Sequence, residues 1–213
     1  MRKPNHIGII PDGNRRWAEE KGLTKEMGYV SGIDPGLILF KHCQELGIKE
    51  MTYYGFTMDN TKRPREQRKA FTNACIQAVE LLSKENAELL VVGNKDSEMF
   101  PIELKEFTKR RRFGEGGIKV NFLVNYSWEW DLDNLKGAGS SKGKVSTLIN
   151  SKDISRVDLI VRWGGRRRLS GFLPIQSIYS DFYIIDDYWP DFKIDQFYEA
   201  LSWYNRQDIT LGG

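Results

Sequence analysis

Short apolar runs alternate with longer segments of helical periodicity along most of the chain, and this alternation constrains the fold more than any other feature. The runs that indicate strands cover residues 6–10, 50–56, 89–94, 118–126, 157–163 and 181–186. The segments that indicate helices cover residues 36–47, 65–88, 101–113 and 193–207. Strand, helix and strand in repeated succession predict a mainly parallel sheet with helices on both faces. We therefore expect a single α/β domain with a central sheet of about six strands flanked by helices, without internal repeats or a domain boundary.

The turn after the first predicted strand combines an acid with two arginines, in the stretch HIGIIPDGNRRWAEEKG at residues 6–22. A strand-to-helix turn leaves backbone N–H groups unpaired at the positive end of the helix dipole, so it attracts anions, and Arg15 and Arg16 strengthen that attraction. Asp12 would repel an anion unless a cation lies between them, and Mg²⁺ bridging a carboxylate to a diphosphate is the usual case. A helix cap formed by Asp12 or Asn14, with the arginines in solvent, is the simpler explanation for these residues taken alone.

Polar residues also follow the other predicted strands, and ligands of parallel sheets bind at the carboxyl ends of the strands. These residues are Thr57, Asp59, Asn60, Arg63, Asn125, Tyr126 and Arg162. Because parallel strands end at one edge of a sheet, we expect these side chains to lie close together.

The segment VRWGGRRRLSGF is a second candidate phosphate site, since it combines a Gly-Gly turn with Arg166, Arg167, Arg168 and Ser170. Arginine forks bind phosphate oxygens in pairs, and glycine lets backbone amides approach the ligand. A solvated turn explains the three arginines equally well. Two anion sites, each accompanied by an acid (Asp12, and Asp181 after the second), are typical of an enzyme with two diphosphate substrates.

The charges of the chain nearly balance, with 32 Lys and Arg against 29 Asp and Glu, so a nucleic-acid partner is not implied. His6 and His42 are the only histidines, which excludes a multi-histidine metal site. Cys43 and Cys75 lie far apart in apolar contexts and do not form a pattern of metal ligands, as is typical of a reducing cytosolic setting. The N-terminus has no apolar signal-peptide core and no apolar run approaches about 18 residues, so we expect a soluble, cytoplasmic protein.

Five blocks of the sequence occur in the order found in the cis-prenyltransferases, the undecaprenyl and dehydrodolichyl diphosphate synthase family, which this chain resembles. The blocks are HIGIIPDGNRRWA, CQELGIKEMTYYGFTMDNTKRP, KVNFLVNY, DLIVRWGGRRRLSGFLPIQSIYSDFY and DDYWPDF. They span nearly all of residues 1–213 except 136–153, a Gly-, Ser- and Lys-rich stretch predicted to be a mobile segment within the domain. The resemblance implies an enzyme that joins an allylic isoprenoid diphosphate to isopentenyl diphosphate with Z geometry, releasing diphosphate.

The resemblance also implies roles for individual residues. It places the metal-binding aspartate at Asp12 and the catalytic asparagine at Asn60, with Mg²⁺ as the cofactor and Asp181 where the family has a glutamate as second metal ligand. The residues expected at the allylic diphosphate are Gly13, Asn14, Arg15, Arg16, Trp17, Lys25, Tyr29, Thr57 and Arg63. The residues expected at the acceptor diphosphate are Arg162, Arg168 and Ser170, with Arg166 beside them. Charge develops on the leaving diphosphate as the allylic C–O bond breaks, so cations at that position stabilise the transition state.

The growing prenyl chain needs an apolar tunnel, and the segment 65–88 is the best candidate for its wall. An apolar stripe recurs there at helical spacing, formed by Phe71, Ala74, Cys75, Ala78, Leu81 and Leu82. Packing against the sheet is the simpler explanation for most of these residues. The resemblance implies that part of the stripe lines the tunnel, where bulky side chains would limit product length.

The chain departs from the family pattern at several positions. The replacements are Lys25 for an arginine, Tyr29 for a histidine, Trp128 for a glycine, Glu129 for an arginine, Trp163 for a small polar residue and Arg166 for an acid. The two indoles would reduce the volume of the acceptor pocket, and Arg166 adds positive charge where diphosphate or metal should lie. We therefore expect Trp128, Trp163 and Arg166 to reshape the acceptor pocket.

Three functional hypotheses remain open: a prenyltransferase of the usual kind, a member with a different acceptor and irregular coupling, and a non-catalytic partner subunit. Retention of Asp12, Asn60 and Arg162 argues against the third. A nucleotide-binding module is less favoured, since no GxGxxG fingerprint follows the first strand. The resemblance also implies a homodimer, and the lipid product implies peripheral contact with a membrane. The aromatic stretch FYEALSWY is suited either to packing against a partner or to closing the chain's own core.

Overall fold

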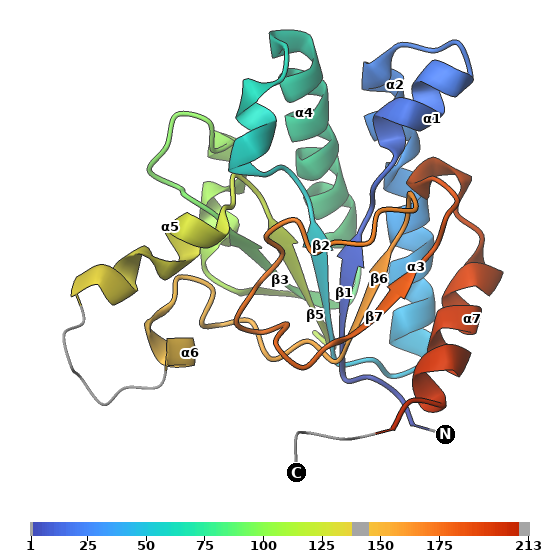
Figure 1. Cartoon of the computed structure of the whole chain (residues 1–213). Coiled ribbons are helices and arrows are strands. Elements are labelled where there is room, and N and C mark those ends of the chain that lie inside the picture. Colours follow the sequence, from blue (N-terminus) through green and yellow to red (C-terminus); the bar gives the residue numbers. More distant parts are fainter. Residues whose placement is uncertain (1, 138–144, 209–213) are drawn as a thin grey trace.

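The computed structural model describes residues 2–137 and 145–208 and contains a seven-stranded sheet with the strand order β4-β3-β5-β2-β1-β6-β7 (Figure 1). The strands are β1 His6–Ile10, β2 Glu50–Tyr54, β3 Ala87–Val92, β4 Arg111–Phe113, β5 Ile118–Leu123, β6 Leu159–Arg162 and β7 Asp181–Ile184. Neighbouring strands are parallel except for β3 and β4. The expected single α/β domain with a mainly parallel sheet is confirmed, and β4 is the strand that the sequence does not predict.

Helices connect most of the strands. The α-helices are α1 Asn14–Glu20, α2 Lys25–Ser31, α3 Ile33–Glu45, α4 Arg65–Leu82, α5 Trp128–Leu132, α6 Val145–Leu148 and α7 Ile194–Asn205. The short 3-10 helices η1 to η4 cover Met58–Lys62, Ile102–Thr108, Asp133–Gly137 and Trp189–Asp191. The predicted helix at 101–113 is wrong in its second half, because residues 111–113 pair with β3 as an edge strand.

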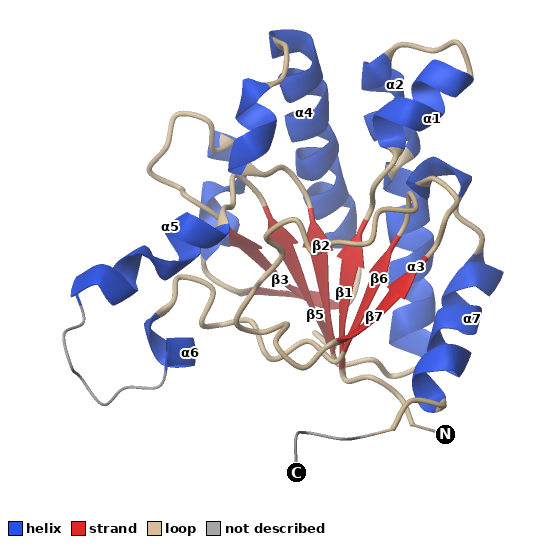
Figure 2. Ribbon diagram, in the orientation of Figure 1, coloured by secondary structure: helices blue, strands red, loops and turns tan. Residues whose placement is uncertain are grey.

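The two faces of the sheet are covered differently. On one face, α3, α4 and α7 pack against the strands, with Leu39, Val79 and Phe197 in the same core. On the other face, Ile154 and Phe172 from segments without regular structure cover the strands, and Figure 2 shows these loops crossing in front of the sheet while α3 lies behind it. Trp130 of α5 also packs against this core, so helices contribute to both faces as expected, but irregular segments make up much of this second cover, since residues 149–157 and 169–180 lack helical periodicity.

The predicted mobile segment at 136–153 falls partly outside the described residues. Within them, Ile149 and Ser151 are buried, and the backbone N–H of Ser151 donates to Oδ1 of Asp131 at 2.7 Å. This end of the segment therefore packs against the domain, and the mobility expected for the rest of it stays a prediction. No helix of the described residues is long and apolar enough to cross a membrane. Cys43 and Cys75 are both buried and free.

Candidate active site

The carboxyl ends of β1, β2 and β6 lie side by side at one edge of the sheet. In the parallel registers, Ile10 of β1 lies opposite Arg162 of β6, and Ile9 lies opposite Tyr53 of β2. The segments that follow these strands open onto one cavity of about 500 Å³ with a mainly polar lining. Of the polar residues expected to gather at the strand ends, Thr57, Asp59, Asn60, Arg63 and Arg162 line this cavity. Asn125 and Tyr126 do not line it and are buried instead.

Most of the predicted site residues line this polar cavity. They are Asp12, Gly13, Asn14, Arg15, Arg16, Lys25, Tyr29, Thr57, Asn60, Arg63, Arg162, Arg166, Arg168 and Ser170. The sequence reasoning missed Glu19 and Tyr54. Tyr54 is the last residue of β2, so its place at a strand end was the signal that could have identified it.

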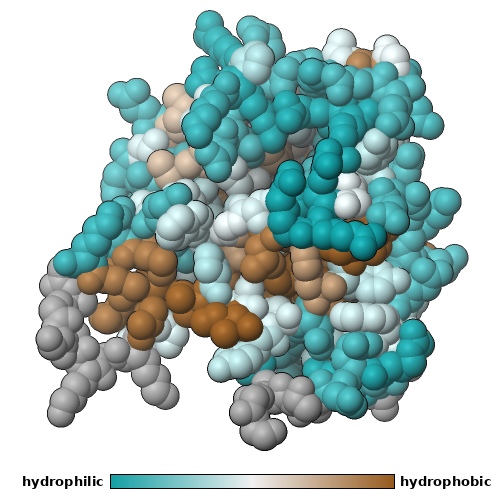
Figure 3. All heavy atoms as spheres, in the orientation of Figure 1, coloured by the Kyte–Doolittle hydropathy of each residue, from teal (hydrophilic) through white to brown (hydrophobic). Residues whose placement is uncertain are grey.

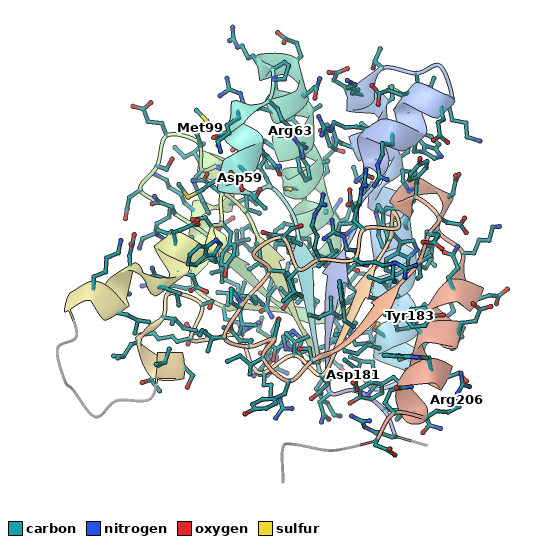
Figure 4. The ribbon with its side chains drawn as sticks, viewed as in Figure 1. Asp59, Arg63, Met99, Asp181, Tyr183 and Arg206 are labelled. Atoms are coloured by element: carbon teal, nitrogen blue, oxygen red, sulfur yellow. The ribbon has the colours of Figure 1, made fainter. Side chains whose placement is uncertain are left out.

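Two predicted site residues lie elsewhere. The indole Nε1 of Trp17 donates to Oδ1 of Asp191 at 2.8 Å and so joins α1 to η4. Asp181 is the first residue of β7, and its Oδ2 lies 3.5 Å from Nη2 of Arg2. Figure 4 shows Asp181 near one end of the sheet and Arg63 near the other. Within one chain, Asp181 and Asp12 therefore lie at opposite ends of the parallel strands, and the metal role that the resemblance implies for Asp181 stays a prediction.

Asp12 is held by three donors at the centre of the cavity. Its Oδ2 accepts from Nη2 of Arg162 at 2.7 Å, while Oδ1 accepts from the backbone N–H of Gly13 at 2.6 Å and lies 3.5 Å from Nη2 of Arg16. Burial raises the pKa of Asp12, but the hydrogen bond and the charge of Arg162 outweigh burial, so the pKa lies below its usual value. Asp12 is therefore ionised at neutral pH.

The turn after β1 is not a side-chain cap of α1. No side chain caps the helix at Gly13, and Nδ2 of Asn14 donates instead to the backbone oxygen of Pro11 at 2.7 Å. Gly13 has φ 98°, and a Cβ there would lie 2.5 Å from Cδ1 of Tyr188. Only glycine fits this position, which leaves the first amides of α1 without a side-chain partner.

Arg162 links the two predicted anion sites. Its side chain is only 4% exposed, and Nη1 donates to Oγ of Ser170 at 3.0 Å and to the backbone oxygen of Arg168. Since Nη2 of the same guanidinium holds Asp12, the turn after β1 and the loop after β6 share one buried cation. A second link joins them, because Nη2 of Arg16 donates to the backbone oxygen of Gly164 at 2.9 Å.

The cavity has an excess of positive charge. Its cations are Arg15, Arg16, Lys25, Arg63, Arg162, Arg166 and Arg168, and its acids are Asp12, Glu19 and Asp59. Among the described residues, the guanidinium groups of Arg15, Arg166 and Arg168 form no ion pair. These groups remain free to bind phosphate oxygens.

Asn60 lies at the end of the cavity formed by η1. Its Oδ1 accepts from the backbone N–H of Thr57 at 3.0 Å, and its own backbone N–H donates to the oxygen of Thr57 at 2.9 Å. Because the carbonyl oxygen is used in this turn, the side-chain NH₂ is the group that can donate to a ligand.

A second, mainly apolar cavity of about 80 Å³ adjoins the polar one. The whole predicted stripe of α4 lines it: Phe71, Ala74, Cys75, Ala78, Leu81 and Leu82. The residues that line both cavities are Pro11, Asn14, Tyr29, Tyr54, Gly55 and Phe71. The α4 stripe thus faces an apolar space that begins where the polar cavity ends.

Comparisons with known proteins agree with this geometry. The family model described as "Putative undecaprenyl diphosphate synthase" matches residues 10–212. The chain belongs to this prenyltransferase family. An isoprenyl transferase of Streptococcus thermophilus is 32% identical over 235 residues, covering 99% of this chain and 93% of that protein. A ditrans,polycis-undecaprenyl-diphosphate synthase of Buchnera aphidicola, named as specific for (2E,6E)-farnesyl diphosphate, is 31% identical over 228 residues, covering 98% and 91%.

The fold of this isoprenyl transferase is shared with a lavandulyl diphosphate synthase from Lavandula x intermedia, solved in complex with dimethylallyl diphosphate. The two chains align with a TM-score of 0.86 and 20% sequence identity, and the alignment covers 99% of each. At this identity the likeness establishes the fold alone.

Two of the three departures expected to reshape the acceptor pocket of the isoprenyl transferase lie outside both cavities. Trp163 is fully buried, packs edge-on against Trp189 at 4.8 Å and donates from Nε1 to Gln196 at 3.0 Å. Trp128 is 46% exposed. The expectation is wrong for Trp163, which follows the end of β6 on the face covered by α7. The Trp128 ring lies beside Gly171 in the loop after β6, where a Cβ added to the glycine would meet Cδ1 of Trp128 at 3.0 Å, so its expected effect on the acceptor site stays a prediction. Only Arg166 lines the polar cavity.

The donor set of the cavity suits Mg²⁺ held mostly by its substrate. No three His, Cys, Asp or Glu residues of the described chain are grouped to hold a metal ion. Asp12 is ionised and 32% exposed at its side chain, so it offers one oxygen ligand. Mg²⁺ commonly binds through one or two carboxylates together with phosphate oxygens and water. The residues present therefore fit this metal.

Proposed function

We propose that the chain condenses an allylic isoprenoid diphosphate with isopentenyl diphosphate, releasing diphosphate and extending the chain with Z geometry. The observation that carries this proposal is the direct junction of a cationic cavity with an apolar one. A prenyl diphosphate needs both environments at a fixed spacing, because its head is anionic and its tail is hydrocarbon. The farnesyl-specific relative named above supports the same substrate class.

The two diphosphates are assigned to the two sides of the polar cavity. The donor diphosphate binds at the turn after β1, with Arg15, Arg16 and Arg63 around it, and its tail enters the apolar cavity. The acceptor diphosphate binds at Arg162, Arg168 and Ser170. This arrangement brings the allylic carbon to the junction of the cavities, within reach of the acceptor's double bond.

The reaction forms one C–C bond and breaks one C–O bond. The C–O electron pair leaves on the donor diphosphate, the π electrons of the acceptor form the new bond, and a proton is then lost from the acceptor. The arginines stabilise the charge that develops on the leaving diphosphate, and the NH₂ of Asn60 is placed to donate to it. Asp12 would hold Mg²⁺ against the diphosphate, where the ion supplies further neutralisation of the leaving group.

Radiolabelled isopentenyl diphosphate tests this proposal. The purified protein is incubated with Mg²⁺ and allylic diphosphates of several lengths, and the extracted products are sized. We expect labelled products longer than the donor by whole isoprene units. Failure to extend any allylic donor, with a folded protein, would contradict the proposal.

A different acceptor remains the second candidate, and of the three departures Arg166 is the one that lines the polar cavity. We expect the change Arg166→Glu to steepen the dependence of activity on Mg²⁺, because the guanidinium contributes positive charge that the metal would otherwise supply alone. It should also raise the acceptor KM by about tenfold, since a charge-assisted hydrogen bond contributes roughly 1.5–3 kcal/mol. Mg²⁺ titrations of the wild type and of Arg166→Glu measure the dependence on the metal. Competition assays with mixtures of acceptors measure which acceptor each protein prefers.

Arg167→Glu is the matched control for this prediction. Arg167 is also exposed but is not among the residues that line the polar cavity, so the same change of charge should leave the Mg²⁺ dependence unaltered. Equal effects of the two substitutions would show that Arg166 acts only through the overall positive charge of the surface and not through its place in the cavity.

The apolar cavity should limit product length. Ala78→Phe adds a ring to the α4 wall, so we expect shorter products at a similar rate of the first condensation. Gln77→Phe places the same ring on the exposed side of α4 and should leave the product lengths unchanged. Chromatographic sizing of the products tests this prediction. Unchanged product lengths for Ala78→Phe would show that the growing prenyl tail does not lie along the α4 wall of the apolar cavity.

We also propose a homodimer in the cytoplasm that contacts the membrane through its lipid product and binds no nucleic acid. Exposed Trp128 and Val145 belong to α5 and α6, and Figure 3 shows an apolar patch on the side of the molecule where these helices lie. A second copy of the chain packed there would cover apolar surface that a monomer leaves in water. Analytical ultracentrifugation at several concentrations tests the dimer.

A further inference from the structure

We propose that two tyrosine hydroxyls at the junction of the cavities position the two diphosphate sites separately, Tyr29 acting on the donor site and Tyr54 on the acceptor site. This inference rests on the proposed function, which assigns the donor diphosphate to Arg63 and the acceptor diphosphate to Ser170. Both tyrosines line both cavities. Their hydroxyl groups, however, bond to opposite sides of the polar cavity.

Tyr29 fixes the position of Arg63. Nη1 of Arg63 donates to the hydroxyl of Tyr29 at 2.8 Å, and the Arg63 side chain makes no other hydrogen bond with the described residues. The ring of Tyr29 is itself fixed, because it is 4% exposed and stacks on Phe71 with centroids 4.6 Å apart and planes 4° from parallel. The guanidinium carbon lies 5.5 Å from the centroid of Phe71. One N–H of the Arg63 guanidinium is thus used to fix its position, and the other N–H groups of this guanidinium can donate to a ligand.

Tyr54 fixes the loop of the acceptor site. Its hydroxyl donates to the backbone oxygen of Ser170 at 2.6 Å, and its ring packs edge-on against Phe172 at 5.4 Å. Ser170 has φ 53°, a left-handed conformation that is unfavourable for a non-glycine residue and needs support from its surroundings. Oγ of Ser170 in turn accepts from Arg162 at 3.0 Å. The Tyr54 hydroxyl therefore holds in place a residue expected to bind the acceptor diphosphate.

The two hydroxyls can be removed separately by Tyr29→Phe and Tyr54→Phe, which keep both rings. Calorimetry then measures the binding of each substrate alone, with an unreactive allylic thiodiphosphate as the donor and isopentenyl diphosphate as the acceptor. We expect Tyr29→Phe to weaken the donor by about tenfold and Tyr54→Phe to weaken the acceptor by about two- to tenfold. In each variant the other substrate should bind within about twofold of the wild type, and the two KM values should follow the same pattern.

Tyr126→Phe is the control for the loss of a buried hydroxyl. The hydroxyl of Tyr126 donates to Asp131 at 2.8 Å, and the residue lines neither cavity. This variant should lower the Tm without changing the affinity for either substrate. A merely structural role for Tyr29 or Tyr54 would give the same result.

A double-mutant cycle tests the link from Tyr29 to Arg63. In an Arg63→Gln background, Tyr29→Phe should cause no further loss of donor affinity, because the group it positions is gone. An equal loss of affinity for both substrates in either variant would overturn the inference while leaving the proposed function intact. Additive losses of donor affinity in the double-mutant cycle would do the same. A folded wild type that binds neither substrate would overturn the proposed function and this inference with it.

Discussion

Replacing Asp12 by Asn should lower turnover by at least about 100-fold while the protein stays folded, since removal of one group that stabilises transition-state charge typically costs that much. Asn keeps the shape of the side chain and one oxygen, which can accept from either Gly13 or Arg162 but not from both, because these donors bond to different oxygens of the carboxylate. It removes the negative charge that would hold Mg²⁺ against the diphosphate. Steady-state kinetics at saturating Mg²⁺, together with a thermal melt, measure both parts of the prediction.

Alanine is the poorer choice at this position. Arg162 is 4% exposed, and Asp12→Ala would leave its guanidinium without its carboxylate partner. Removing one member of a buried pair typically costs about 3–5 kcal/mol, so the alanine variant confuses loss of chemistry with loss of stability. Asp133→Asn, on the surface beside Lys136, is a suitable control for the loss of one carboxylate. Near-normal turnover of folded Asp12→Asn would exclude the metal role.

The parallel sheet and the position of the site could be predicted because both depend on local patterns. An apolar strand followed by polar residues is visible in the sequence, and parallel strands place their carboxyl ends together by geometry alone. The stripe of α4 was visible for the same reason, since residues at helical spacing share one face. Phe71, Ala74 and Ala78 line the apolar cavity as the stripe indicated.

Residues that depend on tertiary placement could not be assigned in the same way. Trp163 follows Arg162 directly, yet neighbouring side chains point to opposite faces at a strand end, so one lines the polar cavity and the other lies in the core. Asp181 lies away from Asp12 within one chain, and the sequence pattern already indicated this. It begins its own strand, and the first residue of a parallel strand lies at the edge opposite the site.

The segments without regular structure that cover the second face of the sheet also could not be predicted from the sequence patterns. Ile154, Phe172 and Leu173 are buried there without helical or strand periodicity, so no local rule identifies them as core. The bond from Tyr54 to Ser170 belongs to the same class, because it joins residues 116 positions apart. Such contacts follow from the path of the whole chain.

We expect Arg162→Ala and Arg168→Ala to differ strongly in their effects on KM and kcat. From the sequence alone, both arginines are expected to serve the acceptor. In the structure, Arg162 holds Asp12 with one nitrogen and Ser170 with the other, whereas the Arg168 guanidinium is exposed and lines the cavity. Arg168→Ala should therefore raise the acceptor KM by roughly 10- to 100-fold with little effect on the donor, as expected for one charge-assisted bond to phosphate.

Arg162→Ala should instead raise both KM values and lower kcat, because it releases the carboxylate on the donor side and the serine on the acceptor side together. It should also lower the Tm, since the Asp12 carboxylate loses its nearest cation. Arg167→Ala, which removes a neighbouring exposed arginine that does not line the cavity, is the control for the loss of one positive charge. Initial rates over a grid of both substrate concentrations separate the two KM values. If Arg162→Ala changed the acceptor KM alone, the buried guanidinium would not couple the two sites, and the acceptor-only role expected from the sequence would stand.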